Sequence, residues 1–350
     1  MKGQDLEIVD TDMYEYMLTY SFPCQDLSKA GKGKGMHKGS GTRSGLLWEV
    51  ERLLNECEHL PQILVMENVP DVIGTKNIKD FQLWLTTLED LGYSNYVECL
   101  NSKNFGIPQT RNRAYMISIL GDKYYGFPNE IPLELKLKDL LEEEVDACFY
   151  LNEEQLKRVL RSKYDQGKRF MDIEYICHTL TTRPTMIIGN VNPSGRGMSG
   201  NIYYGDIAPT LTSGHGKGPK MMMEGLLIPE NTKQGYTVAN DGDGIYIDRP
   251  FQKRGVVQKG MIQTIKTSCH DVAVVLGASA KEYKNAFFIR KLTPIECWRL
   301  MGFDDESYYK AEKVNSKTQL YKQAGNSIVV DVLVAIFHQF FINKSNDEEE

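Results

Sequence analysis

Cys24 has the position expected of a nucleophile. It follows an apolar and aromatic run at residues 16–22, and Pro23 fixes the backbone directly before it. At the end of a buried strand its thiol is expected to be accessible, and the basic residues between 29 and 43 favour its thiolate form. The alternative is a small buried hydrophobic residue, the commonest state of an intracellular cysteine.

Glu67 is a candidate proton donor. It lies near the end of a second apolar run, residues 62–69, where a carboxylate is costly unless it leaves the core. Partly buried, it would hold a raised pKa and could give up a proton near neutral pH. A strand-end carboxylate that accepts a bond from a backbone amide is the other interpretation.

The segment QTRNR, residues 109–113, brings two arginines to alternate positions at the start of a predicted strand. Side chains at alternate positions of a strand point to the same face, so Arg111 and Arg113 can act together. Two planar guanidinium groups suit a carboxylate, a phosphate or the polar edge of a base. An ordinary solvated charge pair has the same pattern.

A basic loop follows Cys24. Residues 29–43, KAGKGKGMHKGSGTR, contain five Lys or Arg and no acidic residue, which is the composition of a mobile loop that contacts phosphates. The Gly spacing matches neither a dinucleotide-binding turn nor a Walker loop. A flexible solvated loop is the alternative.

The segment QAGNS, residues 323–327, precedes the last apolar stretch of the chain. Asn326 and Ser327 can cap the helix that this stretch predicts. Loop residues at a helix N-terminus can also donate hydrogen bonds to a ligand.

The elements that must hold these residues alternate between strand and helix over the first 120 residues. Apolar runs predict strands at residues 16–22, 62–69, 94–101 and 113–121, and helical spacing predicts helices at 46–60 and 80–91. This alternation predicts an α/β fold with a doubly wound, largely parallel sheet. Since parallel strands present their carboxyl ends at one edge, Cys24 and Glu67 should meet there.

The pattern changes after about residue 126. Residues 134–161 are charged and predict a helical linker, and residues 178–270, rich in Gly, Thr, Pro and Asn, predict an irregular, strand-containing second domain. From residue 287 the pattern is helical again. The predicted division is a catalytic domain at 1–130, a linker and second domain at 131–286, a return to the catalytic domain at 287–343, and a frayed acidic tail at 344–350.

Composition limits the class of protein. With 350 residues, 41% hydrophobic and 25% charged, the chain has the make-up of a soluble globular protein and not of a disordered chain, a fibre or a coiled-coil rod. No apolar run is long enough for a membrane span, and the N-terminus lacks the order of a signal peptide. Seven cysteines without a CxxC pair indicate a reducing cytoplasm and no structural metal site. Because the net charge is −6, the positive charge that a DNA partner needs must be local.

Taken in order, six segments resemble the motif series of bacterial DNA (cytosine-5-)-methyltransferases of the restriction-modification type. The segments are SFPCQDLS (21–28), RSGLLWE (43–49), MENV (66–69), QTRNR (109–113), RKLTPIECWRLMGF (290–303) and QAGNS (323–327). The match spans residues 21–120 and 287–340, and the irregular region between them falls where that family keeps its target-recognition domain. The resemblance implies a Rossmann-like, S-adenosylmethionine-dependent fold and methyl transfer to carbon 5 of a cytosine flipped out of double-stranded DNA.

The resemblance also implies a role for each candidate residue. Cys24 would add to ring carbon 6, Glu67 would bond to ring nitrogen N3 and the exocyclic amine, and Arg113 with Arg111 would hold the cytosine carbonyl. The contacts implied for S-adenosylmethionine are Pro23, Leu46, Asn326 and Ser327. The DNA contacts expected on this basis are Lys32, Lys34, Lys38, Arg43, Lys217 and Lys220. The basic loop would close over the DNA as an active-site lid.

The sequence departs from the family pattern in front of Cys24. The glycine-rich FxGxG turn, which in the family holds the methionine part of the methyl donor, does not occur in residues 1–23. We therefore expect an incomplete sheet and an incomplete donor site. The explanations are a split enzyme whose missing strands come from a separate polypeptide, a truncated inactive remnant, or a DNA-binding module without methyl transfer; a self-sufficient enzyme is the fourth.

Overall fold

The computed structural model divides the chain into two compact units. The residues it describes are 8–27, 35–152, 155, 186–188, 202–204, 221–223, 226–232, 236–248, 255–267, 270–277 and 287–347. The first unit comprises Met1–Gly106, Arg111–Pro132 and Ile328–Glu350, and the second comprises Ile107–Thr110 and Leu133–Ser327. Cys24, Glu67 and both candidate arginines belong to the first unit.

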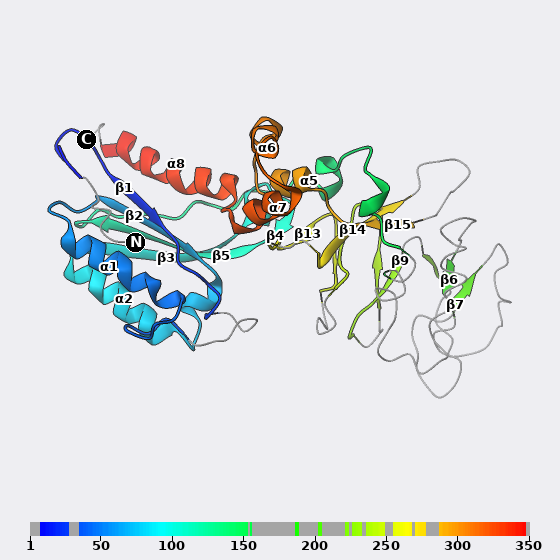
Figure 1. Cartoon of the computed structure of the whole chain (residues 1–350), viewed down its shortest axis with the longest axis horizontal. Coiled ribbons are helices and arrows are strands. Elements are labelled where there is room, and N and C mark those ends of the chain that lie inside the picture. Colours follow the sequence, from blue (N-terminus) through cyan, green and yellow to red (C-terminus); the bar gives the residue numbers. More distant parts are fainter. Residues whose placement is uncertain are drawn as a thin grey trace. The chain divides into compact units, whose positions relative to one another are not determined.

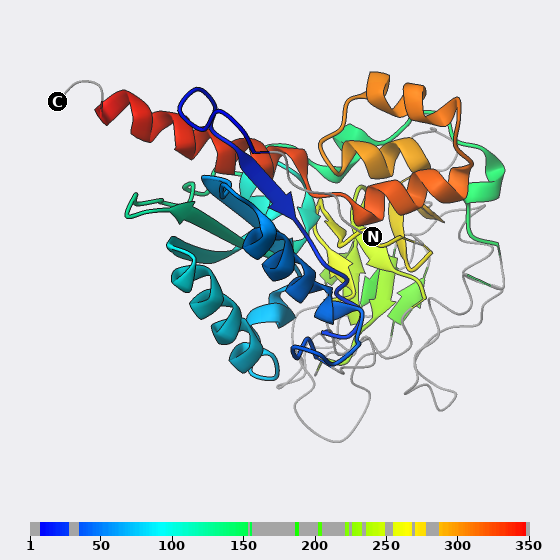
Figure 2. The ribbon, with the colours of Figure 1, turned by 60° about the vertical axis from the view of Figure 1, so that its left-hand side comes forward.

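The first unit is a four-stranded sheet between helices (Figures 1 and 2). Its strands, in spatial order, are β1 (Met17–Tyr20), β2 (Ile63–Asn68), β5 (Asn112–Leu120) and β3 (Tyr93–Asn101). The helices α1 (Leu47–Glu56) and α2 (Ile78–Asp90) lie on one face of this sheet, and α8 (Val330–Asp347) lies on the other. The Tyr125 hydroxyl, in the segment after β5, donates to the Ile336 carbonyl of α8 at 3.0 Å.

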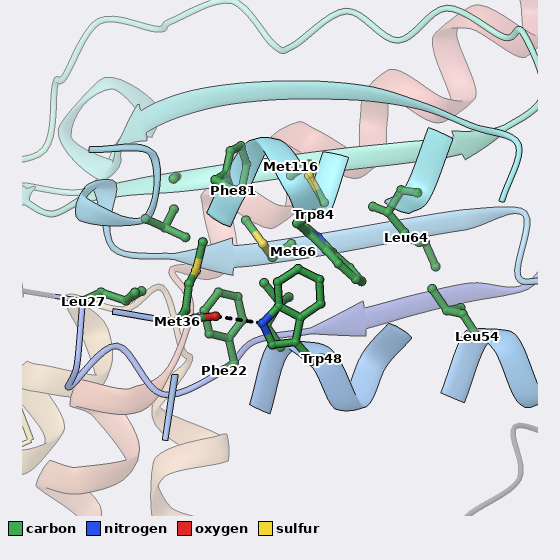
Figure 3. Close-up of a cluster of buried hydrophobic side chains, with 14 of the residues drawn as sticks. Phe22, Leu27, Met36, Trp48, Leu54, Leu64, Met66, Phe81, Trp84 and Met116 are labelled. Carbon is green, nitrogen blue, oxygen red and sulfur yellow. Dashed lines mark hydrogen bonds between the residues drawn. The ribbon is translucent and has the colours of Figure 1, made fainter. Parts of the chain in front are cut away.

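Strand and helix periodicity together explain the core beneath α1 and α2 (Figure 3). Leu64 and Met66, on one face of β2, pack in one cluster with Trp48 of α1 and Trp84 of α2. The two indole rings meet edge to face with their centroids 5.9 Å apart. Residues 63–66 are all buried, which shows that both faces of β2 are covered, as in the middle of an α/β sheet.

Strand direction differs from the largely parallel sheet predicted from the sequence. β1 and β2 are parallel, but β5 is antiparallel to both of its neighbours, β2 and β3. A parallel neighbour needs a crossover of about a dozen residues or more. The connection from β3 to β5 is shorter and contains the 3-10 helix Ser102–Phe105, so β5 returns antiparallel. The α/β class is confirmed, and the parallel arrangement applies to β1 and β2.

The second unit is built from short strands and three described helices. Its strands are β4 (Gln109–Thr110), β6 (Met186–Ile188), β7 (Ile202–Tyr204), β8 (Met221–Met223), β9 (Leu226–Pro229), β10 (Tyr236–Ala239), β11 (Gly244–Tyr246), β12 (Val257–Gln258), β13 (Ile262–Gln263), β14 (Val272–Gly277) and β15 (Phe287–Arg290). The central described sheet has the order β12-β11-β14-β15, and β4 pairs with β13. The helices are α5 (Pro294–Arg299), α6 (Asp305–Glu312) and α7 (Lys317–Asn326).

Residues 133–152 do not form the helix predicted for the linker. They contain the short 3-10 helices Leu137–Leu140 and Ala147–Phe149. The Leu137 amide donates to the Gly260 carbonyl at 2.7 Å, and the Glu142 amide donates to the Glu296 carboxylate at 2.9 Å. These tertiary hydrogen bonds take the backbone groups that a helix would have used.

A buried ion pair joins β15 to α5. Arg290 donates to Glu296 at 2.8 Å and 2.6 Å, and the two side chains are 1% and 0% exposed. The same carboxylate accepts the Thr293 amide at 2.8 Å, which caps α5. The RKLTPIE segment, residues 290–296, therefore stabilises the second unit through this ion pair and through the cap of α5.

The two units also divide the C-terminal region differently from the predicted boundaries. Residues 287–327 belong to the second unit, and the return to the first unit begins at Ile328. One helical stretch, residues 317–340, is apolar and long enough by composition to cross a membrane. It consists of α7 and α8, which the non-helical residues 327–329 separate. Core helices of globular proteins have the same character, so this stretch does not by itself indicate a membrane span.

Candidate active site

Cys24 lies half-buried in a turn past the carboxyl end of β1. Its backbone neighbours are held by side chains from other elements. The Asn68 side chain, at the end of β2, donates to the Phe22 carbonyl at 2.9 Å. Ser44 Oγ, at the start of the 3-10 helix before α1, donates to the Pro23 carbonyl at 2.5 Å. The thiol therefore stands on a well-anchored stretch of backbone.

Glu67 lies at the same edge of the sheet as the turn that carries Cys24. The parallel pairing of Tyr20 with Met66 brings the carboxyl ends of β1 and β2 together. Ser21 Oγ, directly after β1, donates to the Glu67 carbonyl at 2.8 Å and to its carboxylate at 3.4 Å. The fold thus places Cys24 after β1 and Glu67 at the end of β2, on the edge where the carboxyl ends of this parallel pair lie.

The two arginines converge on Glu67 from β5. Arg113 Nε lies 3.0 Å from Glu67 Oε1, and these side chains are 16% and 12% exposed. Arg111, directly before β5, is 4% exposed, and its carbonyl accepts bonds from Ser102 N and Oγ at 3.1 Å and 3.2 Å. Both guanidinium charges act on the Glu67 carboxyl.

Burial moves the pKa values of this cluster away from their ordinary values. Burial raises the pKa of Glu67, and the charges of Arg113 and Arg111 offset this in part. Burial, with help from the charge of Arg113, lowers the pKa of Arg111 to about 10, while Glu67, Tyr115 and Cys24 act in the opposite sense. The site combines a carboxyl group biased towards its protonated form, two guanidinium groups and a thiol. Within the described part of the chain, no three His, Cys, Asp or Glu side chains gather as metal ligands would.

The residues expected to contact S-adenosylmethionine fall into both units. Pro23 and Leu46 belong to the first, where Ser44 links the Pro23 carbonyl to the start of the helix that contains Leu46. Leu46 is 51% exposed, and an exposed apolar side chain beside a strand end fits one wall of a methyl-donor site. Asn326 and Ser327 belong to the second unit, at the end of α7.

The QAGNS segment forms the end of α7, not the N-terminal cap predicted for the last helix. That prediction was wrong, because α8 begins at Val330 and Ser327 is the C-cap of α7. Ser327 Oγ donates back to the Gln323 carbonyl at 2.8 Å. A Cβ on Gly325 would lie 2.4 Å from the Thr267 amide, so α7 packs against that backbone where a glycine is required.

Two of the candidate DNA contacts lie in described residues of the basic loop. Lys38 Nζ is 2.7 Å from a Glu51 carboxylate oxygen and 5.2 Å from the Trp48 ring centroid. Arg43 donates to Gln25 Oε1 at 2.5 Å. Both cations therefore contact the protein itself. The other candidates, Lys32, Lys34, Lys217 and Lys220, lie outside the described residues.

Sequence reasoning that looked for titratable groups missed the polar residues that hold this site. Ser44 and Asn68 are 0% and 2% exposed. The carboxylate of Asp26 accepts the Arg43 amide at 3.0 Å. Their positions in the sequence were the available signal. Ser44, Asn68 and Asp26 each lie in a segment that resembles a family motif, close to a residue for which a role was predicted.

Comparison with known proteins agrees with this geometry. A family model for C-5 cytosine-specific DNA methylases matches residues 1–341. Type II methyltransferase M2.ScrFI of Lactococcus lactis subsp. cremoris is 32% identical over 324 residues, which cover 92% of this chain and 66% of that protein. Orphan methyltransferase M.SPRI of Bacillus phage SPR is 31% identical over 388 residues, with coverages of 95% and 84%.

A solved structure shares the fold. The methyltransferase EhMeth of Entamoeba histolytica matches 94% of this chain and 77% of its own, with a TM-score of 0.53 and 14% sequence identity. At that identity the likeness concerns the fold alone. The family model, which covers nearly the whole chain, carries the assignment. The chain belongs to the C-5 cytosine-specific DNA methylase family, and by family it is a DNA (cytosine-5-)-methyltransferase of the type II and orphan kind.

Proposed function

We propose that this chain methylates carbon 5 of a cytosine flipped out of a specific double-stranded DNA sequence, in a restriction-modification or orphan role in the cytoplasm. The observation that carries the proposal is the cluster of Cys24 and Glu67, at the ends of the parallel strands β1 and β2, with Arg111 and Arg113 at the start of the neighbouring strand β5. A nucleophile, a buried acid and two cations within one unit are the parts that addition to a pyrimidine ring requires.

Cys24 is the proposed nucleophile and Glu67 the proposed acid. The thiolate sulfur bonds to ring carbon 6, and the electron pair of the 5,6 double bond shifts through the ring towards N3. Glu67, whose burial favours the protonated form, gives its proton to N3 and leaves carbon 5 electron-rich. After carbon 5 has gained the methyl group, N3 returns its proton to Glu67 and a solvent base takes the carbon 5 proton. The double bond then re-forms and the sulfur leaves with the electrons of the carbon–sulfur bond.

Arg113 and Arg111 are the proposed contacts of the cytosine carbonyl. Arg113 is oriented by its 3.0 Å pair with Glu67, and Arg111 is close enough to Cys24 for the two charges to interact. Guanidinium groups that are largely buried bind a developing negative charge more strongly than solvated ones. The cluster would therefore stabilise the adduct more than the free base.

S-adenosylmethionine, the donor used by the family, supplies an electrophilic methyl group when bound. Pro23 and Leu46 would form one wall of its site. The outer edge of β1 supports a second part of this proposal. Among the described residues β1 pairs with β2 alone, and its four residues, MLTY, include no proline and no charge of the kind that protects an exposed edge.

We propose that a further strand-bearing segment with a glycine-rich FxGxG turn pairs with this edge of β1 and completes the donor site. Such a turn does not occur in residues 1–23. A separate polypeptide is one possible source of that segment. Because an edge strand presents unpaired N–H and C=O groups, the edge of β1 that is open among the described residues favours the addition of a strand there.

The test is methylation of random-sequence duplex DNA by the purified chain, with and without a polypeptide that carries the FxGxG segment. We expect 5-methylcytosine with the added polypeptide, its loss in Cys24→Ser, and its retention in a Cys148→Ser control, because Cys148 is exposed elsewhere in the chain. Mapping the product also reveals the target sequence. DNA binding without 5-methylcytosine in both conditions contradicts methyl transfer and leaves a DNA-binding module. A clear thermal shift of the chain alone with S-adenosylmethionine contradicts the incomplete donor site.

A further inference from the structure

The backbone on both sides of Cys24 is held by two consecutive residues from a later part of the chain. Ser44 is completely buried, and its Oγ donates to the Pro23 carbonyl at 2.5 Å. The Arg43 amide donates to Asp26 Oδ2 at 3.0 Å, and Asp26 is 8% exposed. Pro23, directly before the nucleophile, and Asp26, two places after it, are therefore both hydrogen-bonded to the segment Arg43–Ser44.

We propose that Ser44 and Asp26 are positioning residues, a Cys24 clamp that orients the thiol for attack on ring carbon 6. The proposal rests on the proposed function of Cys24. Neither side chain contacts the reacting atoms in this scheme, and both act through the backbone of the turn.

The clamp is needed because the turn lies outside the sheet. β1 ends at Tyr20, so the peptide that joins Pro23 to Cys24 has no strand partner. Rotation of this peptide would swing the Cys24 side chain directly. The bond from Ser44 blocks that rotation, and displacement of a reacting atom by about 1 Å can slow a reaction about a hundredfold.

The clamp is also attached to a rigid support. Arg43 and Ser44 lead into the 3-10 helix Ser44–Leu46 and then into α1. α1 is fixed in the core by Leu47 and Trp48, which are 0% and 7% exposed. The position of Cys24 is therefore tied to the core of the first unit through two hydrogen bonds that come from one helix start.

The clamp can be tested through the reactivity of Cys24 in the full chain. Ser44→Ala removes the bond to Pro23, and Ser40→Ala is the matched control, because Ser40 is exposed and its hydroxyl contacts Thr42. Labelling by iodoacetamide is followed for each cysteine by mass spectrometry. In Ser44→Ala we expect Cys24 to label at least about threefold faster, since local opening exposes the thiol, with Cys99, half-buried in β3 of the same unit, unchanged.

Adduct formation should move in the opposite direction. With S-adenosylmethionine, the added polypeptide that carries the FxGxG segment, and random-sequence duplex DNA that contains 5-fluorocytosine, Ser44→Ala should form the covalent complex at least about tenfold more slowly, with unchanged affinity for DNA. Unchanged labelling and unchanged adduct formation in a folded variant overturn the proposal. Equal acceleration at Cys99 also overturns it, because that result indicates general destabilisation of the first unit. If the wild type forms no adduct, the proposed function fails while the labelling still decides the clamp.

A second pair of variants, at Asp26, tests the clamp independently if Ser44→Ala does not fold. Asp26→Asn retains an oxygen that can accept the Arg43 amide, whereas Asp26→Ala does not. We expect Asp26→Ala to show fast labelling and slow adduct formation, and Asp26→Asn to return both towards wild type. Identical behaviour of the two variants contradicts the clamp.

Discussion

Replacement of Arg111 by methionine should make the chain more stable and less active at once. The guanidinium is 4% exposed, and burial is the main cause that lowers its pKa to about 10. Relative to the ordinary value for arginine, this corresponds to a cost of about 3 kcal/mol for the charged form in the folded chain. Arginine is charged in both folded and unfolded states below pH 10, so the whole cost is present at neutral pH. Methionine has a similar length without the charge, and we expect a gain of up to about 3 kcal/mol.

The measurement is hydrogen exchange in increasing urea, followed in peptides of β2 and β5, which report on the first unit alone. Arg52→Met, on an exposed face of α1, is the control for the substitution itself. Adduct formation with 5-fluorocytosine DNA should fall by about a hundredfold or more, as it does when one stabilising donor of an active site is removed. If Arg111→Met is less stable than the wild type, Arg111 holds the fold together, and the interpretation of a costly functional charge is refuted.

Three further results are expected. Glu67→Gln should gain stability relative to the wild type as the pH rises above the ordinary range of a glutamate carboxyl. The raised carboxyl pKa means that the folded wild type binds this proton more tightly and loses stability when it ionises, so a flat difference between their melting temperatures would contradict the assignment. Glu296→Ala leaves Arg290 buried without its carboxylate and should cost about 3 to 5 kcal/mol, seen in urea unfolding by the fluorescence of Trp298; a loss below about 1 kcal/mol would show that the pair is dispensable. Gly325→Ala should destabilise the second unit by about 1 to 3 kcal/mol and speed exchange in α7, because its Cβ meets the Thr267 amide; unchanged exchange would mean that the backbone yields freely.

The elements of the first unit were predictable where hydrophobic spacing is strong. The strand predicted at residues 62–69 is β2 (Ile63–Asn68), and the helix predicted at 80–91 is α2 (Ile78–Asp90). Because both lie in the core, their burial follows the periods of a strand and a helix. The position of β5 between β2 and β3 was not predictable in this way, since its direction depends on the short connection from β3.

The long-range hydrogen bonds of the site and of the linker could not be predicted from the sequence. Ser44 and Pro23 are 21 positions apart, and no period or composition links a serine hydroxyl to that carbonyl. Residues 133–152 carry helix-forming residues, yet bonds from Leu137 to Gly260 and from Glu142 to Glu296 draw the backbone out of a helix. In both cases the decisive contact is long-range in sequence.

The charges at the edge of β1 and β2 depend on one another. Arg111 and Arg113 bring two positive charges into a largely buried region, and an ionised Glu67 balances one of them. Cys24 acts on the pKa of Arg111 in the same sense as Glu67, and both favour the charged guanidinium. Burial favours the protonated carboxyl of Glu67, whereas the charges of Arg113 and Arg111 favour its ionised form, so the two effects oppose each other at this residue. The two arginines therefore hold Glu67 closer to its ionised form than burial alone would, and a variant that lacks one of them should bind the Glu67 proton more tightly.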